Sequence, residues 1–146
     1  MKSKVNFMIE RTLVILKPDC MQKNLASTVI ERFTQAGLSL VACKMMRLQE
    51  SLLREHYDFL IDKPFFPSIV SYMMECPVLV LVLRGENAIA VVRGLLGPTD
   101  SSTAPKGTIR GDFGQDKSRN IAHASDSQEV AVKEIARFFT TNEVFA

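Results

Sequence analysis

Apolar residues recur along the chain in two patterns, which predict strands separated by helices. Short runs rich in β-branched residues, such as VLVLVL, predict strands that are buried on both faces. Apolar residues three or four positions apart predict helices, and Gly37 and Gly97 each follow such a pattern as a stop. Strands are expected over 11–17, 38–48, 78–83 and 120–124. Helices are expected over 24–36, 51–60, 67–74, 86–96 and from about 126, with Asp126 as the N-cap, to 139.

The order of these elements predicts an α+β fold. Two split βαβ units give a ferredoxin-like, four-stranded antiparallel sheet (βαββαβ), with a helical hairpin inserted before the third strand. Covering helices are expected on one face, and the continuous apolar runs indicate that extra helices or another subunit cover the second face. With 146 residues the chain is expected to form one domain over 1–146, with residues 1–8 as a flexible or tag-like extension.

Charge and composition leave the predicted fold unchanged and exclude some classes of partner. The net charge of +2 gives no strong field for nucleic acid, and no strand carries the aromatic pattern of an RNA-binding sheet, so no specific nucleic-acid partner is expected. No apolar run is long enough to cross a bilayer, and no membrane partner is expected. Three scattered cysteines without CxxC spacing indicate reduced thiols, and a cytoplasmic location is expected.

The segment 98–119 is long for a loop and predicts either a binding loop or an ordinary solvated one. Its glycines at 107, 111 and 114 permit close backbone approach. Hydroxyl and cationic donors of this kind suit an anion such as phosphate. The donors are Thr99, Lys106, Thr108 and Arg110.

His123 and Glu134 form a second candidate for chemistry. An imidazole can act near neutral pH as a base, a ligand or a nucleophile. Glu134 is the sole charge inside the apolar arc of the last helix, where a carboxylate needs a partner such as an imidazole N–H. The alternative is a carboxylate that reaches water at the edge of the arc. A metal site is not expected, because the other histidine, His56, lies on a separate element.

Further candidates stand at the ends of predicted elements. Lys17 ends the first strand, and Arg93 interrupts an apolar helix just before the long loop. Tyr57 and the Phe65–Phe66 pair lie on the helical hairpin, where aromatic rings serve either the core or a nucleobase.

Taken in order, these segments resemble the nucleoside diphosphate kinase family over residues 9–143. The resemblance is carried by ERTLVILKPD, REHYDF, KPFF, GENAIAVVRGLLGPT, GTIRGDFG and NIAHASDS. It implies a ferredoxin-like sheet with an inserted helical hairpin, in agreement with the order of elements above. It also implies an enzyme that moves the terminal phosphoryl group of a nucleoside triphosphate to a nucleoside diphosphate by a ping-pong mechanism.

The resemblance implies a role for each candidate. His123 is the nucleophile, phosphorylated at Nδ1; Glu134 accepts a hydrogen bond from the other ring nitrogen, and Ser125 supports that carboxylate. Phe65 stacks on the base, Lys17 and Asn120 contact the ribose, and Mg²⁺ bridges phosphate oxygens without a direct protein ligand. The phosphates are held by Lys17, Tyr57, Arg93, Thr99 and Arg110.

The family pattern is not followed everywhere. Ala124 replaces a glycine and would be strained if that position had a positive φ, and Lys117 replaces an apolar residue near the base. Asp100 and Ser101 replace asparagine and proline in a loop that serves subunit contacts, and the expected assembly is a homo-oligomer, a tetramer or hexamer built from dimers. Two other functions stay open: a ferredoxin-like nucleic-acid-binding module, and a kinase-like regulator without activity.

Overall fold

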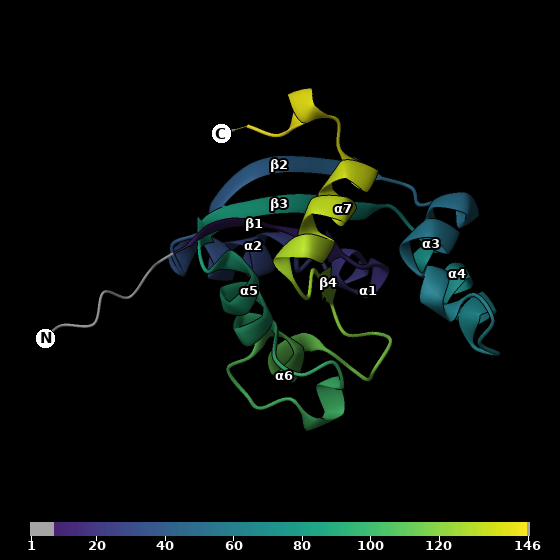
Figure 1. Cartoon of the computed structure of the whole chain (residues 1–146). Helices are drawn as coiled ribbons and strands as arrows, with labels where there is room; N and C mark the ends of the chain where they lie inside the picture. The colour runs from purple at the N-terminus through teal and green to yellow at the C-terminus, as the bar shows by residue number, and fades with distance from the viewer. Residues whose placement is uncertain (1–7, 146) are drawn as a thin grey trace, which may run out of the picture.

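The computed structural model describes residues 8–145, so the predicted extension lies outside the described residues except for Met8. Its sheet has the order β2-β3-β1-β4, and every neighbouring pair is antiparallel (Figure 1). This arrangement confirms the ferredoxin-like prediction. The strands are β1 (Ile9–Leu16), β2 (Ser39–Met46), β3 (Val78–Glu86) and β4 (Ala122–Ala124).

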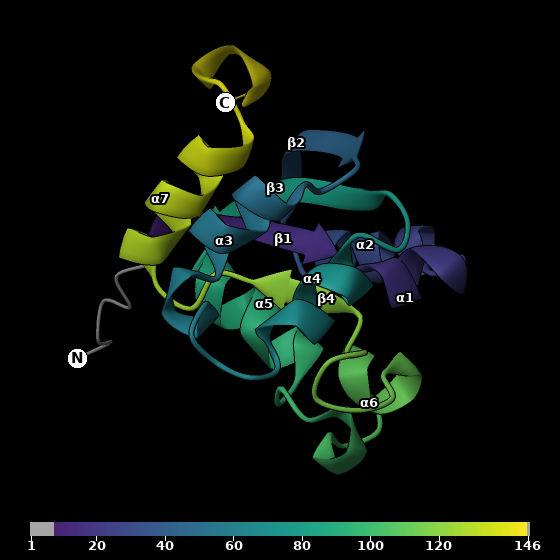
Figure 2. The same cartoon turned by 90° about the vertical axis from the view of Figure 1, so that its right-hand side faces the viewer.

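Helices cover both faces of this sheet. The helical hairpin of α3 and α4 and the last helix α7 lie on one side, as Figure 2 shows, and α2 and α5 lie on the other. The helices are α1 (Pro18–Gln22), α2 (Ala26–Gln35), α3 (Glu50–His56), α4 (Phe66–Met73), α5 (Ala88–Leu96), α6 (Ile109–Phe113) and α7 (Gln128–Phe138).

The central strand β1 explains why both faces need cover. Its side chains alternate in direction, so Val14 packs with Phe33 of α2 on one face, while Ile15 packs with Phe138 of α7 on the other. All four of these apolar residues are fully buried or nearly so. Helices of the same chain therefore provide the second layer, one of the two sources of cover that the apolar runs predict.

Several boundaries differ from the predictions for local reasons. The five-residue helix α1 was not predicted, because it is too short to show a period; Pro18 starts it. The predicted helix over 51–60 breaks at Tyr57, and a 3₁₀ turn follows over Asp58–Leu60. The predicted N-cap Asp126 is wrong: Ser127 caps α7, and its Oγ accepts the Val130 N–H at 3.1 Å.

Two more differences concern the segments on either side of α5. The strand β3 runs to Glu86, where it pairs with Ile9, so α5 begins at Ala88 rather than at 86. The long loop holds a 3₁₀ turn over Ser101–Thr103 and the helix α6. None of the helices within residues 8–145 combines the length and the apolar character that a membrane crossing requires.

Candidate active site

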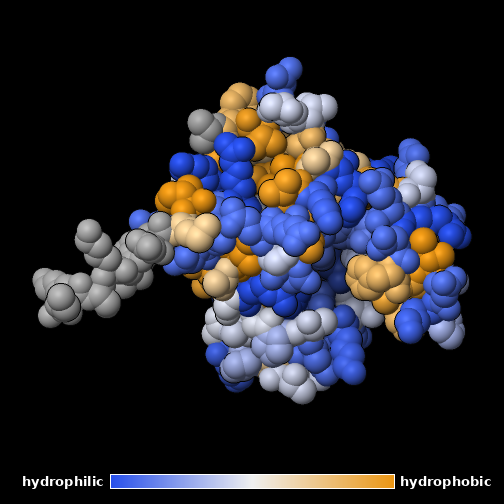
Figure 3. Space-filling model, viewed as in Figure 1, coloured by the Kyte–Doolittle hydropathy of each residue, from blue (hydrophilic) through white to orange (hydrophobic). Residues whose placement is uncertain are grey.

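A cavity of about 1190 Å³ opens between the helical hairpin, the 98–119 segment, β4 and α7. Figure 3 shows a hollow with a hydrophilic surface between the helical hairpin and the 98–119 segment, which lies at the bottom of the view. Of the residues to which the family resemblance gives a role, Ser125 is the one that does not line the cavity. The lining includes Lys17, Tyr57, Phe65, Arg93, Thr99, Arg110, Asn120, His123 and Glu134.

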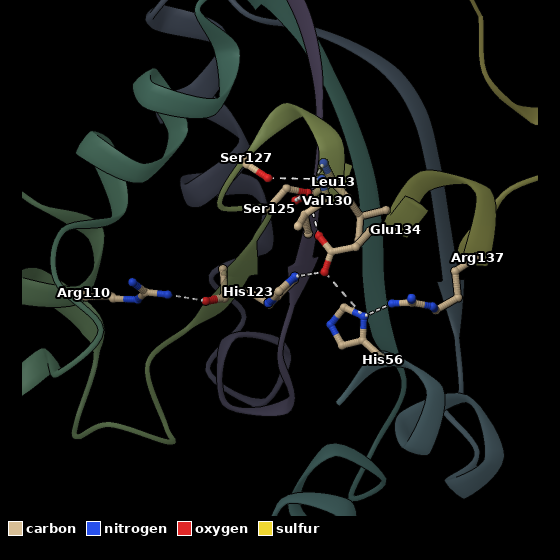
Figure 4. A network of polar contacts seen from close by, with 10 residues as sticks. Leu13, His56, Arg110, His123, Ser125, Ser127, Val130, Glu134 and Arg137 are labelled. Carbon is tan, nitrogen blue, oxygen red and sulfur yellow. Dashed lines mark hydrogen bonds and ion pairs between the residues drawn. The ribbon is translucent and has the colours of Figure 1, made fainter. Parts of the chain in front are cut away.

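His123 is held from one side by a buried carboxylate. Its place in β4, opposite Ile15 of β1, fixes the backbone, and its Nε2 lies 2.8 Å from Oε2 of Glu134 (Figure 4). Because an ionised carboxylate only accepts, Nε2 carries the proton and Nδ1 keeps its lone pair. Within residues 8–145, no group hydrogen bonds to this Nδ1. The ring therefore offers an oriented nucleophilic nitrogen.

Glu134 has a partner for each oxygen, although it is only 4% exposed. Ser125 Oγ donates to Oε1 at 2.7 Å, and Ser125 Oγ itself accepts the Leu13 N–H at 3.2 Å. Burial by itself raises the pKa of this carboxyl, but the hydrogen bonds from His123 and Ser125 outweigh it, and the pKa lies below its ordinary value. The carboxylate is thus ionised at neutral pH, as its predicted role requires.

His56 belongs to the same cluster, which the sequence did not reveal. Its ring packs edge-to-face on that of His123 at 4.5 Å, and its Nδ1 accepts from Arg137 Nη1 at 2.9 Å. Burial, followed by the charges of its neighbours, lowers the pKa of His56 to about 3, so this ring is neutral. No motif spacing connects His56 with His123; the packing of α3 beside α7 and β4 brings them together.

His56, His123 and Glu134 present three metal-ligand atoms within 4.8 Å of one another. The guanidinium of Arg137 donates to Nδ1 of His56 and places a positive charge where a cation would bind. The donor set therefore fits a hydrogen-bonded cluster better than a metal cage.

Lys17, Arg93 and Arg110 form a cationic wall of the cavity, and Asn120 holds Lys17 in place. Lys17 Nζ donates to Asn120 Oδ1 at 2.8 Å and to the carbonyl oxygen of Ser118 at 2.7 Å. Burial lowers the pKa of Lys17 to about 8, with smaller effects from Asp19 and other charges. The side-chain Nδ2 of Asn120 donates to the carbonyl oxygen of Thr99 at 3.0 Å, which ties the long loop to the segment that leads into β4.

Arg110 has a structural role that the sequence analysis missed. Its guanidinium donates to the carbonyl oxygens of Gly97, Asn120 and Ala122 at 3.0, 3.1 and 2.7 Å. Burial lowers its pKa to about 10, with a further effect from Arg93, so it stays charged. Arg110 thus braces the backbone on both sides of the cavity while it lines it.

The remaining predicted residues separate into two groups. Phe65 is 50% exposed at the start of α4, and Arg93 and Thr99 are also exposed at the cavity. Tyr57 is half-buried, with its ring centroid 6.5 Å from that of His123, and burial raises the pKa of its hydroxyl, which remains a donor. The loop donors Lys106 and Thr108 lie away from the cavity. Thr108 caps α6, and Lys106 belongs to the turn before this helix.

Backbone strain is found at Ile121 rather than at Ala124. Ala124 is in β4 and has no positive φ, so an alanine is accommodated there without the strain considered above. Ile121, two residues before His123, has φ +77°.

This fold and site define a ferredoxin-like protein built around a carboxylate-oriented histidine that faces lysine and arginine, a combination suited to phosphoryl transfer. The model of the nucleoside diphosphate kinase family matches residues 10–144. The chain belongs to the nucleoside diphosphate kinase family.

Relatives and solved structures agree on this family. The chain is 45% identical over 137 residues to the mitochondrial nucleoside diphosphate kinase of Columba livia, covering 94% of this chain and 76% of the pigeon protein. The nucleoside diphosphate kinase of Aquifex aeolicus superposes with a TM-score of 0.90 at 43% identity, covering 94% of this chain and 99% of that one. A structure of the Halobacterium salinarum nucleoside diphosphate kinase in complex with CDP superposes with a TM-score of 0.92 at 41% identity, covering 95% and 93%.

Proposed function

We propose that this protein is an active nucleoside diphosphate kinase that passes a phosphoryl group through His123. The observation that carries the proposal is the hydrogen bond of 2.8 Å between His123 Nε2 and Glu134, which leaves Nδ1 as the nucleophile in a cavity lined by cations. The other two functions are less well supported, because an intact oriented histidine serves neither a nucleic-acid-binding sheet nor an inactive regulator.

The reaction proceeds in two half-reactions. Nδ1 of His123 attacks the terminal phosphorus of a nucleoside triphosphate; a P–N bond forms, the P–O bond to the bridging oxygen breaks, and the nucleoside diphosphate leaves with that electron pair. A second nucleoside diphosphate then attacks the phosphohistidine and restores the free ring. Glu134 accepts a hydrogen bond from the Nε2–H throughout and balances the positive charge that develops on the imidazole.

The cationic wall stabilises the charge that spreads over the transferring group. Lys17, Arg93 and Arg110 supply positive charge, and Thr99 and Tyr57 supply hydroxyl donors. Because phosphoryl transfer has a loose transition state, alignment and charge stabilisation provide most of the rate enhancement. The rigid support of Lys17 and Arg110 by backbone carbonyls favours such alignment.

The nucleoside is proposed to bind along the outer part of the cavity. Phe65 would stack on the base, and Lys17 together with Asn120 would contact the ribose. CDP in the Halobacterium salinarum structure supports a nucleotide as the ligand. Stacking reads no base edge, so several nucleosides are expected to be substrates.

Mg²⁺ is proposed to enter with the nucleotide. Two of the carboxylates at the cavity are already hydrogen bonded, since Glu134 accepts from His123 and Ser125, and Asp116 accepts the N–H groups of residues 118 and 119. Mg²⁺ typically binds substrate phosphates and keeps several waters, so phosphate oxygens would hold the ion, with no direct protein ligand. When bound, it would neutralise phosphate charge.

We further propose a cytoplasmic homo-oligomer, a tetramer or hexamer built from dimers. The strand β2 is an edge strand, and Leu40 and Met45 on it are exposed, which favours pairing with a second copy. All three cysteines are free thiols, as in a reducing compartment. Sedimentation at several concentrations distinguishes these assemblies from a monomer.

Incubation with γ-³²P-ATP and Mg²⁺ tests the enzymatic proposal. The wild-type protein should acquire acid-labile, alkali-stable label that a GDP chase transfers to GTP, and His123→Ala should acquire none. Lys106→Ala removes a loop cation outside the cavity and should label like the wild type. A folded wild-type protein without label would reject the kinase in favour of a regulatory or binding role.

A further inference from the structure

The turn at Ile121 is an unusual structure for its sequence. Ile121 is β-branched and fully buried, and its φ of +77° lies in the region that favours glycine. The Ala122 N–H donates to the carbonyl oxygen of Asn120 at 2.9 Å, which closes a three-residue turn. Since a branched side chain opposes this backbone conformation, the surrounding structure has to maintain it.

The surrounding groups hold all three carbonyl groups of this turn and the N–H of Ile121. Arg110 donates to the carbonyl oxygens of Asn120 and Ala122, and the Lys17 N–H donates to that of Ile121 at 2.9 Å. The Ile121 N–H donates to Oδ2 of Asp19 at 3.0 Å. Lys17 and Arg110 already belong to the proposed site, whereas the reaction as described leaves the Asp19 carboxylate without a role.

Asp19 is itself held firmly. It is 3% exposed, and its other oxygen, Oδ1, accepts a short hydrogen bond from the hydroxyl of Tyr72. The Asp19 N–H in turn donates to the Tyr72 hydroxyl oxygen at 3.4 Å. Tyr72 comes from α4, so the pair links α1 and the helical hairpin to the chain segment that enters β4.

The consequences of this link reach both sides of the site. Asn120, the first residue of the turn, directs Oδ1 to Lys17 Nζ, and His123, which directly follows the turn, pairs with Ile15. Relaxation of Ile121 to a negative φ would rotate its flanking peptide groups and displace both side chains.

We propose that Asp19, held by Tyr72, is a positioning residue for phosphoryl transfer, because it maintains the left-handed turn at Ile121 that orients Asn120 and His123. This inference rests on the proposed function. It concerns residues that do not touch the reacting atoms, so it requires a test that separates positioning from folding.

The first test is the rate of His123 phosphorylation at saturating ATP, measured by rapid quench in proteins whose urea unfolding shows them to be folded. Asp19→Ala should lower this rate by about tenfold to a hundredfold, since a buried N–H loses its acceptor. Asp19→Asn keeps an amide oxygen for Ile121 and should stay within about threefold of wild type. Asp112→Ala removes another carboxylate that accepts a backbone N–H, outside the cavity, and should leave the rate unchanged.

The second test uses glycine at position 121. Glycine adopts a positive φ without the penalty of a side chain, so Asp19→Ala should cost at most about threefold in an Ile121→Gly background. If Asp19 has a purely structural role, the double variant should lose at least as much phosphorylation rate as the two single variants together, because Ile121→Gly also removes a buried side chain. If the double variant does not fold, Tyr72→Phe decides: the rate should fall about threefold or more at unchanged global fold.

The outcomes separate this inference from the proposed function. Wild-type protein without label would reject the kinase itself. If the wild type is labelled but Asp19→Ala or Tyr72→Phe is phosphorylated at the wild-type rate, the positioning role alone is overturned. The same holds if the rate lost in Asp19→Ala equals the fraction of unfolded protein, or if Ile121→Gly does not suppress that loss.

Discussion

Replacing Glu134 with glutamine separates the charge of this carboxylate from its shape. The amide oxygen can still accept from His123 Nε2, and Ser125 Oγ can accept from the new amide nitrogen, so no buried polar group loses all partners. What is lost is the charge that supports the imidazole. A hydrogen bond to a charged group contributes about 1.5–3 kcal/mol and a neutral one about 0.5–1.5 kcal/mol, which leaves a difference of about 1–1.5 kcal/mol.

Because about 1.4 kcal/mol corresponds to a factor of ten, Glu134→Gln should slow His123 phosphorylation roughly tenfold. Glu134→Ala removes both acceptor oxygens and should cost about 2–4 kcal/mol, roughly 30- to 1000-fold. Glu134 is nearly fully buried, so solvent screening does not reduce these values much.

The assay is a rapid-quench measurement of label transfer from γ-³²P-ATP to the protein, with urea unfolding as the measure of stability. Glu129→Gln, on the solvent-exposed face of the same helix, is the matched control and should behave like wild type. A wild-type phosphorylation rate in Glu134→Gln would refute the reasoning, because the carboxylate charge would then contribute nothing to the transfer.

Three other predictions follow from the site and from α7. Since the pKa of Lys17 is about 8, kcat/KM should fall as the pH rises through about 8 and the ammonium loses its charge, whereas a flat profile to pH 9 would contradict its role. Phe65→Ala should raise the KM for nucleotides about tenfold, since stacking contributes about 1–3 kcal/mol per base. Phe145→Ala removes an exposed ring outside the cavity and should leave the KM unchanged, so equal KM values for the two variants would count against stacking. Ser127→Ala should lower the free energy of unfolding by about 1 kcal/mol through the lost cap on Val130 N–H, and urea unfolding in which Ser127→Asp is equally destabilised would disprove this cause.

The pH dependence of stability that Lys17 contributes has the opposite direction from that of a lysine whose ammonium is stabilised by a carboxylate partner. Its pKa falls from 10.5 to about 8 on folding, because burial disfavours the charged form. Between these two values the unfolded chain binds more protons, so this group makes folding more favourable as the pH rises. Activity and the Lys17 contribution to stability should therefore change in opposite directions above pH 8.

Much of the fold was predictable because its determinants are local. The apolar runs of β1 and β3 fix two central strands, and the single charge inside the apolar arc of α7 identifies Glu134 as a carboxylate that needs a buried partner. The order of strands and helices is enough to predict the ferredoxin-like sheet. The boundaries at Tyr57 and Ser127 were missed because a break or a cap depends on a few hydrogen bonds that no period records.

Only the tertiary structure decided which distant groups act together. His56 and His123 are far apart in the sequence, yet the packing of α3 beside α7 and β4 brings their rings into contact, and burial there gives His56 an unusually low pKa. Arg110 could be identified as a cation from the sequence, but not as the brace of three carbonyl groups.

The sequence by itself determined the class of fold and the chemistry that the chain carries, since periodicity and residue types are properties of short segments. The partners of Asp19, the left-handed turn at Ile121 and the alignment of His123 depend on contacts between α1, α4 and β4. Such contacts exist only when the whole chain has folded, because burial, local dielectric and hydrogen-bond geometry are set by segments far apart in the sequence.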